Sequence, residues 1–174
     1  VIDIHAGGED LIFPHHENEI AQSEDANGTE FTRYWMHNAL LKINNEKMSK
    51  SLGNFFTVRE IGEKYDLQVI RFFMLSAHYR SPLNFSADLV ESSKNGLERI
   101  KTAYAKLQEL CANGTDGDMS AEEASFVKQL DGYVEKFEAA MDDDLNTADA
   151  ISVIFELVKF ANTTTTEGAT KAYA

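Results

Sequence analysis

Two lysines and two serines lie within five consecutive residues in the first third of the chain, and a Leu-Gly-Asn sequence follows them. The segment reads Lys47-Met48-Ser49-Lys50-Ser51. Ammonium groups, hydroxyls and backbone N–H groups are hydrogen-bond donors, and together they suit a polyphosphate on which negative charge moves during a reaction. A solvated basic loop has the same composition, so the segment alone leaves both interpretations open.

A second group of reactive side chains lies at the start of a helix that we predict from Pro14 to Glu24. His15 and Glu19 are four residues apart, so they lie on one face of this helix. An imidazole and a carboxylate at this spacing provide half of a tetrahedral zinc site, and the other ligands must come from elsewhere. The alternative is a polar helix start, where acidic residues favour the N-terminal end of the helix dipole.

A third candidate is the turn predicted over residues 6–10, directly after an apolar strand predicted over residues 1–5. The turn contains Gly7, Gly8 and Asp10. Glycines allow a close approach of the backbone to a ligand, and an aspartate can accept from a hydroxyl. This pattern suits a nucleotide ribose at the carboxyl end of an α/β sheet, although an ordinary strand-to-helix turn explains it as well.

The elements that must position these residues are short in the first half of the chain. We predict a strand over residues 39–43, a tight return over 44–46, and a short helix over 58–65. Thr57 and Glu60 have the spacing of a capping box at the start of this helix. Asp66 caps the next helix, whose apolar residues recur at helical spacing.

After Pro82 everything is predicted to be helical, because proline ends the preceding helix and long amphipathic patterns follow. The expected helices run over residues 86–111, from the Ser120 capping box through Phe137, and onward from Ala148. The three aspartates at 142–144 favour a solvated helix cap over a metal site.

The change near Pro82 from short mixed elements to long helices predicts two domains. We predict that residues 1–80 form an α/β domain and that residues 81–174 form a helical bundle. The fold class is therefore α/β plus α, with helix predominating.

Composition limits the functions that the chain can have. The 174 residues include 29 acidic and 16 basic side chains, giving a formal charge of −13, so DNA binding through a basic surface is not expected. A single cysteine, Cys111, allows no internal disulfide and favours the reducing cytoplasm. We expect no membrane span, because no apolar run reaches about 18 residues. The predicted first strand already includes Val1, without an initiating Met or a preceding cap, and this indicates a fragment of a longer protein.

Several motifs of this chain together resemble the cysteinyl-tRNA synthetases, which are class I aminoacyl-tRNA synthetases. The resemblance covers roughly residues 1–160, and the lysine-serine segment alone occurs in several class I synthetases. The motifs are Asp3-Ile4-His5, Gly7-Gly8, Asp10-Leu11, Phe13-Pro14-His15-His16-Glu17-Asn18-Glu19, Tyr34-Trp35-Met36-His37, Lys47 to Asn54, His78 to Phe85, and Met141 to Thr147.

The resemblance implies an ATP-dependent ligase that joins L-cysteine to tRNA(Cys) through cysteinyl-adenylate. It also implies that residues 1–80 are the carboxyl-terminal portion of a Rossmann-like catalytic nucleotide-binding domain, and that residues 81–174 are a truncated helical bundle of the anticodon-binding type. Lys47 and Lys50 would neutralise the leaving pyrophosphate, with magnesium accompanying the ATP. Asp10 would contact the ribose, with Gly8 beside it in the same turn. His37 occupies the position at which members of this family contact the adenosine. Lys50 is therefore implied to be both catalytic and ATP-binding.

The resemblance also implies one zinc ion that binds the substrate thiol, held in this family by two cysteines, one histidine and one glutamate. His15 and Glu19 match the last two ligands. Both zinc cysteines and the family's His-Ile-Gly-His loop would precede Val1, and Cys111 lies on a helix of the second domain. The isolated chain is therefore expected to bind zinc weakly or not at all, and to make no adenylate.

Two other functions remain open. A related enzyme that activates cysteine in the same way but transfers it to an amino sugar would keep the zinc residues and the lysines. A non-catalytic helical module that binds RNA or protein would leave the lysine segment merely solvated.

Overall fold

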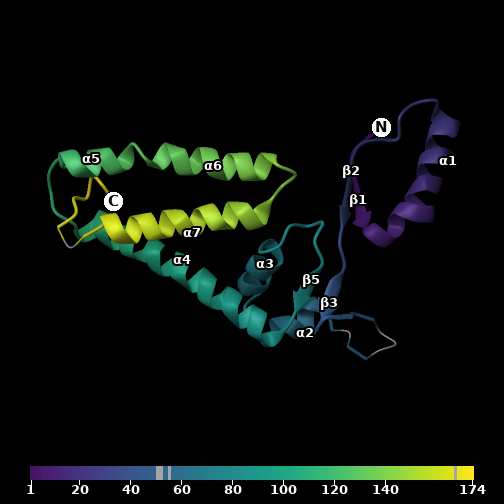
Figure 1. Ribbon diagram of the computed structural model, residues 1–174, viewed down its shortest axis with the longest axis horizontal. Coiled ribbons are helices and arrows are strands. Elements are labelled where there is room, and N and C mark those ends of the chain that lie inside the picture. Colours follow the sequence, from purple (N-terminus) through teal and green to yellow (C-terminus); the bar gives the residue numbers. More distant parts are fainter. Residues whose placement is uncertain (50–52, 55, 167) are drawn as a thin grey trace. The chain divides into compact units, whose positions relative to one another are not determined.

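The computed structural model describes residues 1–49, 53–54, 56–166 and 168–174, and its elements are shown in Figure 1. The chain forms two compact units, each made of two segments. They are Val1–Ile61 with Ala77–Ser86, and Gly62–Ser76 with Ala87–Ala174. The predicted domains, 1–80 and 81–174, stay a prediction. The predicted mixture of α/β structure followed by helices, with helix predominating, is confirmed.

The first unit opens with a strand–helix–strand arrangement in which two parallel strands form a sheet. Its elements are β1 (Ile2–Gly8), the 3-10 helix η1 (Glu9–Leu11), the π-helical turn η2 (Ile12–His16), α1 (Glu17–Asn27) and β2 (Thr32–Asn38). The predicted first strand is confirmed, but it continues to Gly8 where we expected a turn, because pairing with β2 continues to the last residue of both strands. β2 was not predicted from the sequence.

A second sheet in this unit has the order β4–β3–β5. Its strands are β3 (Leu41–Ile43), β4 (Glu46–Lys47) and β5 (Leu83–Phe85). Asn44 and Asn45 join β3 to β4 with φ values of 50° and 69°. Two residues with positive φ are what a tight hairpin turn needs, so the predicted return is confirmed.

Residues 83–85 are a strand, and the prediction that everything after Pro82 is helical is wrong there. β5 pairs in parallel with β3, with Leu83 opposite Leu41 and Phe85 opposite Ile43. This pairing joins residues that are far apart in sequence, and no local helical preference competes with it over so short a segment.

The predicted capping box at the start of α2 (Val58–Gly62) is confirmed. The Thr57 N–H donates to Glu60 Oε2 at 2.6 Å, and the Glu60 N–H donates to Thr57 Oγ1 at 3.2 Å. The helix ends at Gly62, earlier than the sequence suggested.

The second unit is helical. Its helices are α3 (Leu67–Leu75), α4 (Ala87–Asn113), α5 (Ala121–Val127), α6 (Leu130–Asp142) and α7 (Thr147–Thr164). Helix α3 packs on α4, α4 packs on α7, and α6 and α7 lie side by side (Figure 1). The Asp66 cap is confirmed by a bond from the Gln68 N–H to Asp66 Oδ1. The single helix predicted from Ser120 through Phe137 is wrong, because the helix is interrupted between α5 and α6.

Apolar side chains from three of these helices form the core of the second unit. They include Val69, Phe73, Val90, Ala103, Ala150 and Val158, all buried. Phe72 and Phe155 meet edge to face with ring centroids 6.4 Å apart. Among the residues that the structure describes, no helix is both long and apolar enough to span a membrane.

The last residues of the chain are bound to the start of α5. Thr170 forms a bridge with Thr115, and its N–H donates to Glu123 Oε1 at 2.8 Å. Glu123 is 8% exposed and also accepts from the Ser120 N–H, which completes the predicted capping box. One carboxylate therefore both caps a helix and holds the carboxyl-terminal segment.

Candidate functional site

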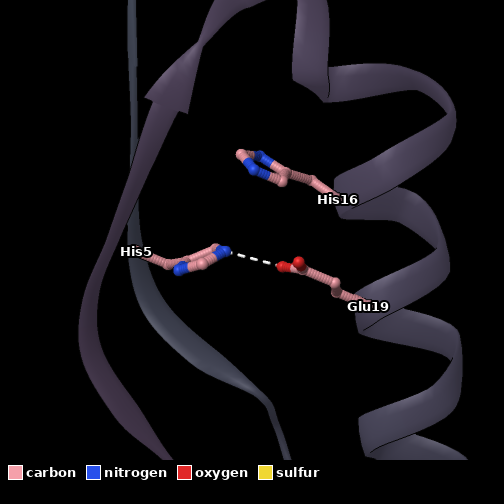
Figure 2. A group of neighbouring side chains, drawn as sticks. All are labelled: His5, His16 and Glu19. Carbon is pink, nitrogen blue, oxygen red and sulfur yellow. Dashed lines mark hydrogen bonds and ion pairs between the residues drawn. The ribbon is translucent and has the colours of Figure 1, made fainter.

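Three side chains that can act as metal ligands meet between β1 and the helical segment that follows it. His5 comes from β1, His16 from η2 and Glu19 from α1, and Figure 2 shows all three directed toward one another. One ligand atom from each lies within 4.8 Å of the others. His5 Nε2 and Glu19 Oε2, from residues 14 positions apart, are hydrogen bonded at 2.6 Å. The group is therefore pre-assembled from three elements within the first 27 residues of the chain, β1, η2 and α1.

The register of the β1–β2 sheet explains how these residues come together. His5 is paired with Trp35, and Gly7 is paired with His37. Side chains alternate along a strand, so these four positions belong to one face of the sheet. Gly7 leaves space on this face that the ring of His16 fills. A Cβ atom at Gly7 would lie only 2.8 Å from His16 Cε1.

Aromatic rings surround the three residues. The centroid of His5 lies 4.9 Å from that of Trp35 and 5.6 Å from that of Phe31. Trp35 stacks on His37 with an interplanar angle of 6°. His16 Nδ1 and His37 Nε2 are hydrogen bonded at 2.8 Å. The cluster therefore joins two hydrogen-bonded pairs, one between an imidazole and a carboxylate and one between two imidazoles.

Burial lowers the pKa of His37 below its ordinary value of 6.5, and electrostatic interactions with His16, Arg80 and His5 lower it further. Its ring is therefore neutral near pH 7 and carries one donor and one acceptor nitrogen. A neutral ring suits contact with an uncharged group such as a nucleoside base.

The chemistry of the donor set fits zinc, which binds imidazole nitrogen and carboxylate oxygen. Glu19, predicted as a zinc ligand, belongs to the metal-capable group. His15, its predicted partner, does not: it is exposed, and the structure brings Glu19 together with His5 and His16 instead. His15 has no hydrogen-bond partner among the described residues, so its ring is available to ligands from outside the chain.

Asp10 and Gly8 lie together at the carboxyl end of β1. A Cβ atom at Gly8 would be 2.4 Å from Asp10 Oδ1, so the carboxylate lies directly over the glycine. Asp10 is exposed. His37 is next to the last residue of the neighbouring strand β2, so all three predicted ATP residues of this region lie at the carboxyl edge of the parallel pair.

Lys47 is the last residue of β4 and is exposed, and Lys50 lies outside the described residues. Asn54 holds the described part of this segment together. Its Oδ1 accepts from the Ser49 N–H at 2.9 Å, and its Nδ2 donates to the Lys47 carbonyl at 3.1 Å. This bridge fixes the residues on both sides of the second lysine.

His5, His16, Trp35 and Asn54 were not predicted as site residues. Gly7 was predicted in a turn, whereas β1 continues to Gly8; a strand of that length would have placed His5 on the face of Gly7 through its period of two. The choice between His15 and His16 had no such signal, because neighbouring residues on a helix point about 100° apart and both are histidine.

The fold is that of class I aminoacyl-tRNA synthetases. The LeuRS of Agrobacterium radiobacter K84, solved in a ternary complex with tRNA and LeuAMS, matches with a TM-score of 0.77 at 18% identity, over 98% of this chain and 24% of that one. The methionyl-tRNA synthetase of Mycobacterium tuberculosis, solved with methionyl-adenylate, matches with a TM-score of 0.73 at 22% identity, over 92% of this chain and 33% of that one.

Sequence comparison defines the family within this class. The catalytic domain of the class I (C) tRNA synthetases matches residues 1–95, and the DALR domain matches residues 136–174. The cysteine--tRNA ligase of Lachnospira eligens is 64% identical over 172 residues, which are 99% of this chain and 36% of that protein. That of Clostridioides difficile is 56% identical over 173 residues, 99% of this chain and 37% of that protein.

The chain belongs to the cysteine--tRNA ligase family of class I synthetases, which confirms the resemblance. It spans a little over a third of the length of the curated relatives it matches.

Proposed function

We propose that this chain works within a longer cysteine--tRNA ligase. In the first step the carboxylate of L-cysteine attacks the α-phosphorus of ATP, forming cysteinyl-adenylate and releasing pyrophosphate. In the second step the cysteinyl group passes to tRNA(Cys). The observation that carries the proposal is the position of Asp10 and His37 at the carboxyl edge of two parallel strands, where α/β sheets bind nucleotides. The 64% identity to a cysteine--tRNA ligase supports the choice of amino acid.

In this proposal Asp10 accepts from a ribose hydroxyl, and Gly8 allows the carboxylate to lie close to the strand. The exposed carboxylate has no partner among the described residues, so it is free to accept such a bond. His37 contacts the adenosine with a neutral ring, which its lowered pKa supports. Both groups then orient the nucleotide at this sheet edge.

Lys47 and Lys50 neutralise the charge that grows on the leaving pyrophosphate, together with the magnesium that accompanies ATP. The bridge from Asn54 to the segment around Lys50 supports this role, because it restricts the backbone on both sides. A donor that acts mainly in the transition state lowers the barrier by roughly 3 kcal/mol.

We further propose that Glu19 and His15 are two of the ligands of one zinc ion. Zinc supplies selective binding of a soft thiolate over a hydroxyl, and this separates cysteine from serine. The accessible ring of His15 and the helical spacing to Glu19 support this pair. His5 Nε2 then donates a hydrogen bond to Glu19 Oε2. Carboxylates that bind a metal commonly accept such a hydrogen bond from a neighbouring side chain. The rival set is His5, His16 and Glu19.

The test of adenylate formation is cysteine-dependent exchange of pyrophosphate into ATP by the full-length protein that contains this chain. Lys50→Ala is expected to lower exchange about a hundredfold or more. Lys64→Ala, which removes an exposed lysine of the second unit, is the matched control and should be unchanged. Exchange that needs no cysteine, or a Lys50→Ala variant equal to wild type, would contradict the proposal.

Two further measurements separate the alternatives. Transfer of radiolabelled cysteine to tRNA(Cys) is expected, and transfer to an amino sugar in its place would identify the related activity. The 174-residue chain alone is expected to give no exchange, because it covers about a third of its relatives.

A further inference from the structure

His16 is the most buried ionisable side chain in the described part of the first unit, and in the proposed function it belongs only to the rival set of metal ligands. Its exposed fraction is 5%, whereas the neighbouring His15 is exposed. A buried imidazole must satisfy its nitrogens or lose the hydrogen bonds that it makes in water. His16 does so with another side chain, since its Nδ1 bonds to His37 Nε2 at 2.8 Å.

The ring of His16 is packed on several sides by other rings of the site. Its centroid lies 4.9 Å from that of His5, 5.1 Å from that of Trp35 and 5.0 Å from that of His37. On another side is the backbone of Gly7, where an added Cβ would approach Cε1 to 2.8 Å and Nε2 to 3.2 Å. The ring therefore has little freedom to turn about χ2.

A ring that cannot turn fixes whatever bonds to it. His37 has two such constraints, the hydrogen bond with His16 and the parallel stack on Trp35. Together they define both the plane of the His37 ring and which nitrogen faces His16. The remaining nitrogen, Nδ1, is left for a ligand.

We propose that His16 is a positioning residue, which holds the His37 imidazole in one orientation and one tautomer for contact with the nucleotide. This inference rests on the proposed role of His37 toward adenosine. His16 directly precedes α1, the helix that carries Glu19. The two halves of the site are thereby joined: the helix that contributes a metal ligand also sets the nucleotide contact.

The first experiment uses pyrophosphate exchange by the full-length protein and compares two substitutions. His16→Phe keeps a ring of similar size and removes the hydrogen bond. His16→Asn keeps a donor near the position of Nδ1. We expect His16→Phe to raise KM for ATP about tenfold with a smaller change in kcat, as loss of one good hydrogen bond would. His16→Asn should recover most of this loss.

Gly7→Ala tests the same contact from the backbone side. Its Cβ would displace the His16 ring, so it should raise KM for ATP although it changes neither histidine. Tyr34→Phe is the control, because Tyr34 is an exposed residue of β2 at a position of opposite parity to His37. It should leave KM unchanged.

The second experiment needs no catalysis. The chain has five histidines, so ¹⁵N-histidine spectra at one alkaline pH can resolve the tautomer of each. Wild type and His16→Asn should show one dominant tautomer of His37, and His16→Phe should show a mixture. An unchanged His37 spectrum in His16→Phe would overturn the proposal.

Zinc content of the full-length variants separates positioning from metal binding. We expect both His16 variants to keep the zinc of the wild type. Loss of zinc from both would make His16 a ligand and overturn the positioning role. If wild type gives no cysteine-dependent exchange, the proposed function fails, but the spectra still test the coupling between the two rings.

Discussion

In the described part of each unit, one ionisable side chain is buried and hydrogen bonded. The two side chains differ in the kind of group to which they are hydrogen bonded. His16 in the first unit bonds to a side chain, His37 Nε2. Glu123 in the second unit bonds to backbone N–H groups of Ser120 and Thr170. Their exposed fractions are similar, 5% and 8%.

Burial alone therefore does not distinguish a functional group from a structural one. A carboxylate bound to backbone N–H groups fixes the path of the chain, and its removal affects folding. An imidazole bound to another imidazole fixes a side chain whose own free nitrogen can meet a ligand. Substitutions of His16 should therefore alter ligand binding, and substitutions of Glu123 should alter stability.

Among the effects that test this comparison, the largest is expected on metal binding at Glu19. Glu19→Gln in the full-length protein should lower zinc affinity about tenfold or more, because the amide is a much weaker zinc ligand than the carboxylate. Zinc per protein, measured by mass spectrometry after dialysis against a chelator, checks this. Glu17→Gln on the same helix is the control and should keep its zinc.

The same measurement decides between the two histidine sets. Loss of zinc from His15→Ala, with retention in His5→Phe, would favour the predicted pair. The reverse result would favour the set that the structure brings together.

The next effect is on the stability of the second unit. Glu123→Ala removes the acceptor for Ser120 and Thr170 and should lower the Tm of the full 174-residue chain by roughly 5 °C. Calorimetry gives the Tm, and limited proteolysis should detect earlier cleavage after residue 164. Glu122→Ala changes an exposed neighbour and serves as control. Equal Tm values for the two variants would contradict the role of Glu123.

Stability should also depend on pH through this carboxylate. Hydrogen bonds from the Thr170 and Ser120 N–H groups hold the pKa of Glu123 below its ordinary value of 4.5. The stabilisation is then fully present above pH 4.5 and is lost as the pH falls through the lower folded-state pKa. Denaturant titrations of wild type and Glu123→Gln should give a constant difference above that pH and a shrinking one below it.

The smallest effect is expected at the other capping box. Glu60 bonds only to Thr57 among the described residues, and both are at least partly exposed, so Glu60→Ala removes a local contact without releasing a distant segment. Its Tm should fall by less than that of Glu123→Ala. A larger fall would mean that α2 contributes more to the first unit than its short length suggests.

Local signals in the sequence were sufficient for the caps and turns. The capping boxes at Thr57 and Ser120, the Asp66 cap and the turn at Asn44 each depend on residues close to one another in the chain. The strands β2 and β5 were missed because their partners are distant in sequence, and the short strand β5 has little pattern of its own.

The candidate site was only partly predictable for the same reason. The predicted strand ended at His5, so neither the shared face of His5 and Gly7 nor the pairing that puts Gly7 beside His37 was predicted. The burial of His16 depends on that pairing, so the local sequence could not distinguish it from His15. The second bond of Glu123, to Thr170, joins residues 47 positions apart and has no local signature.

The alternation of the two units along the chain has a consequence for the order of synthesis. The first unit begins with Val1 but is completed only by Ala77–Ser86, and the intervening Gly62–Ser76 belongs to the second unit. On the ribosome, β3 must wait for β5, and α3 must wait for α4, so neither unit can finish folding before Ser86 has emerged. The stretch that contains both lysines, between β3 and β5, is thus made while its supporting sheet is still incomplete.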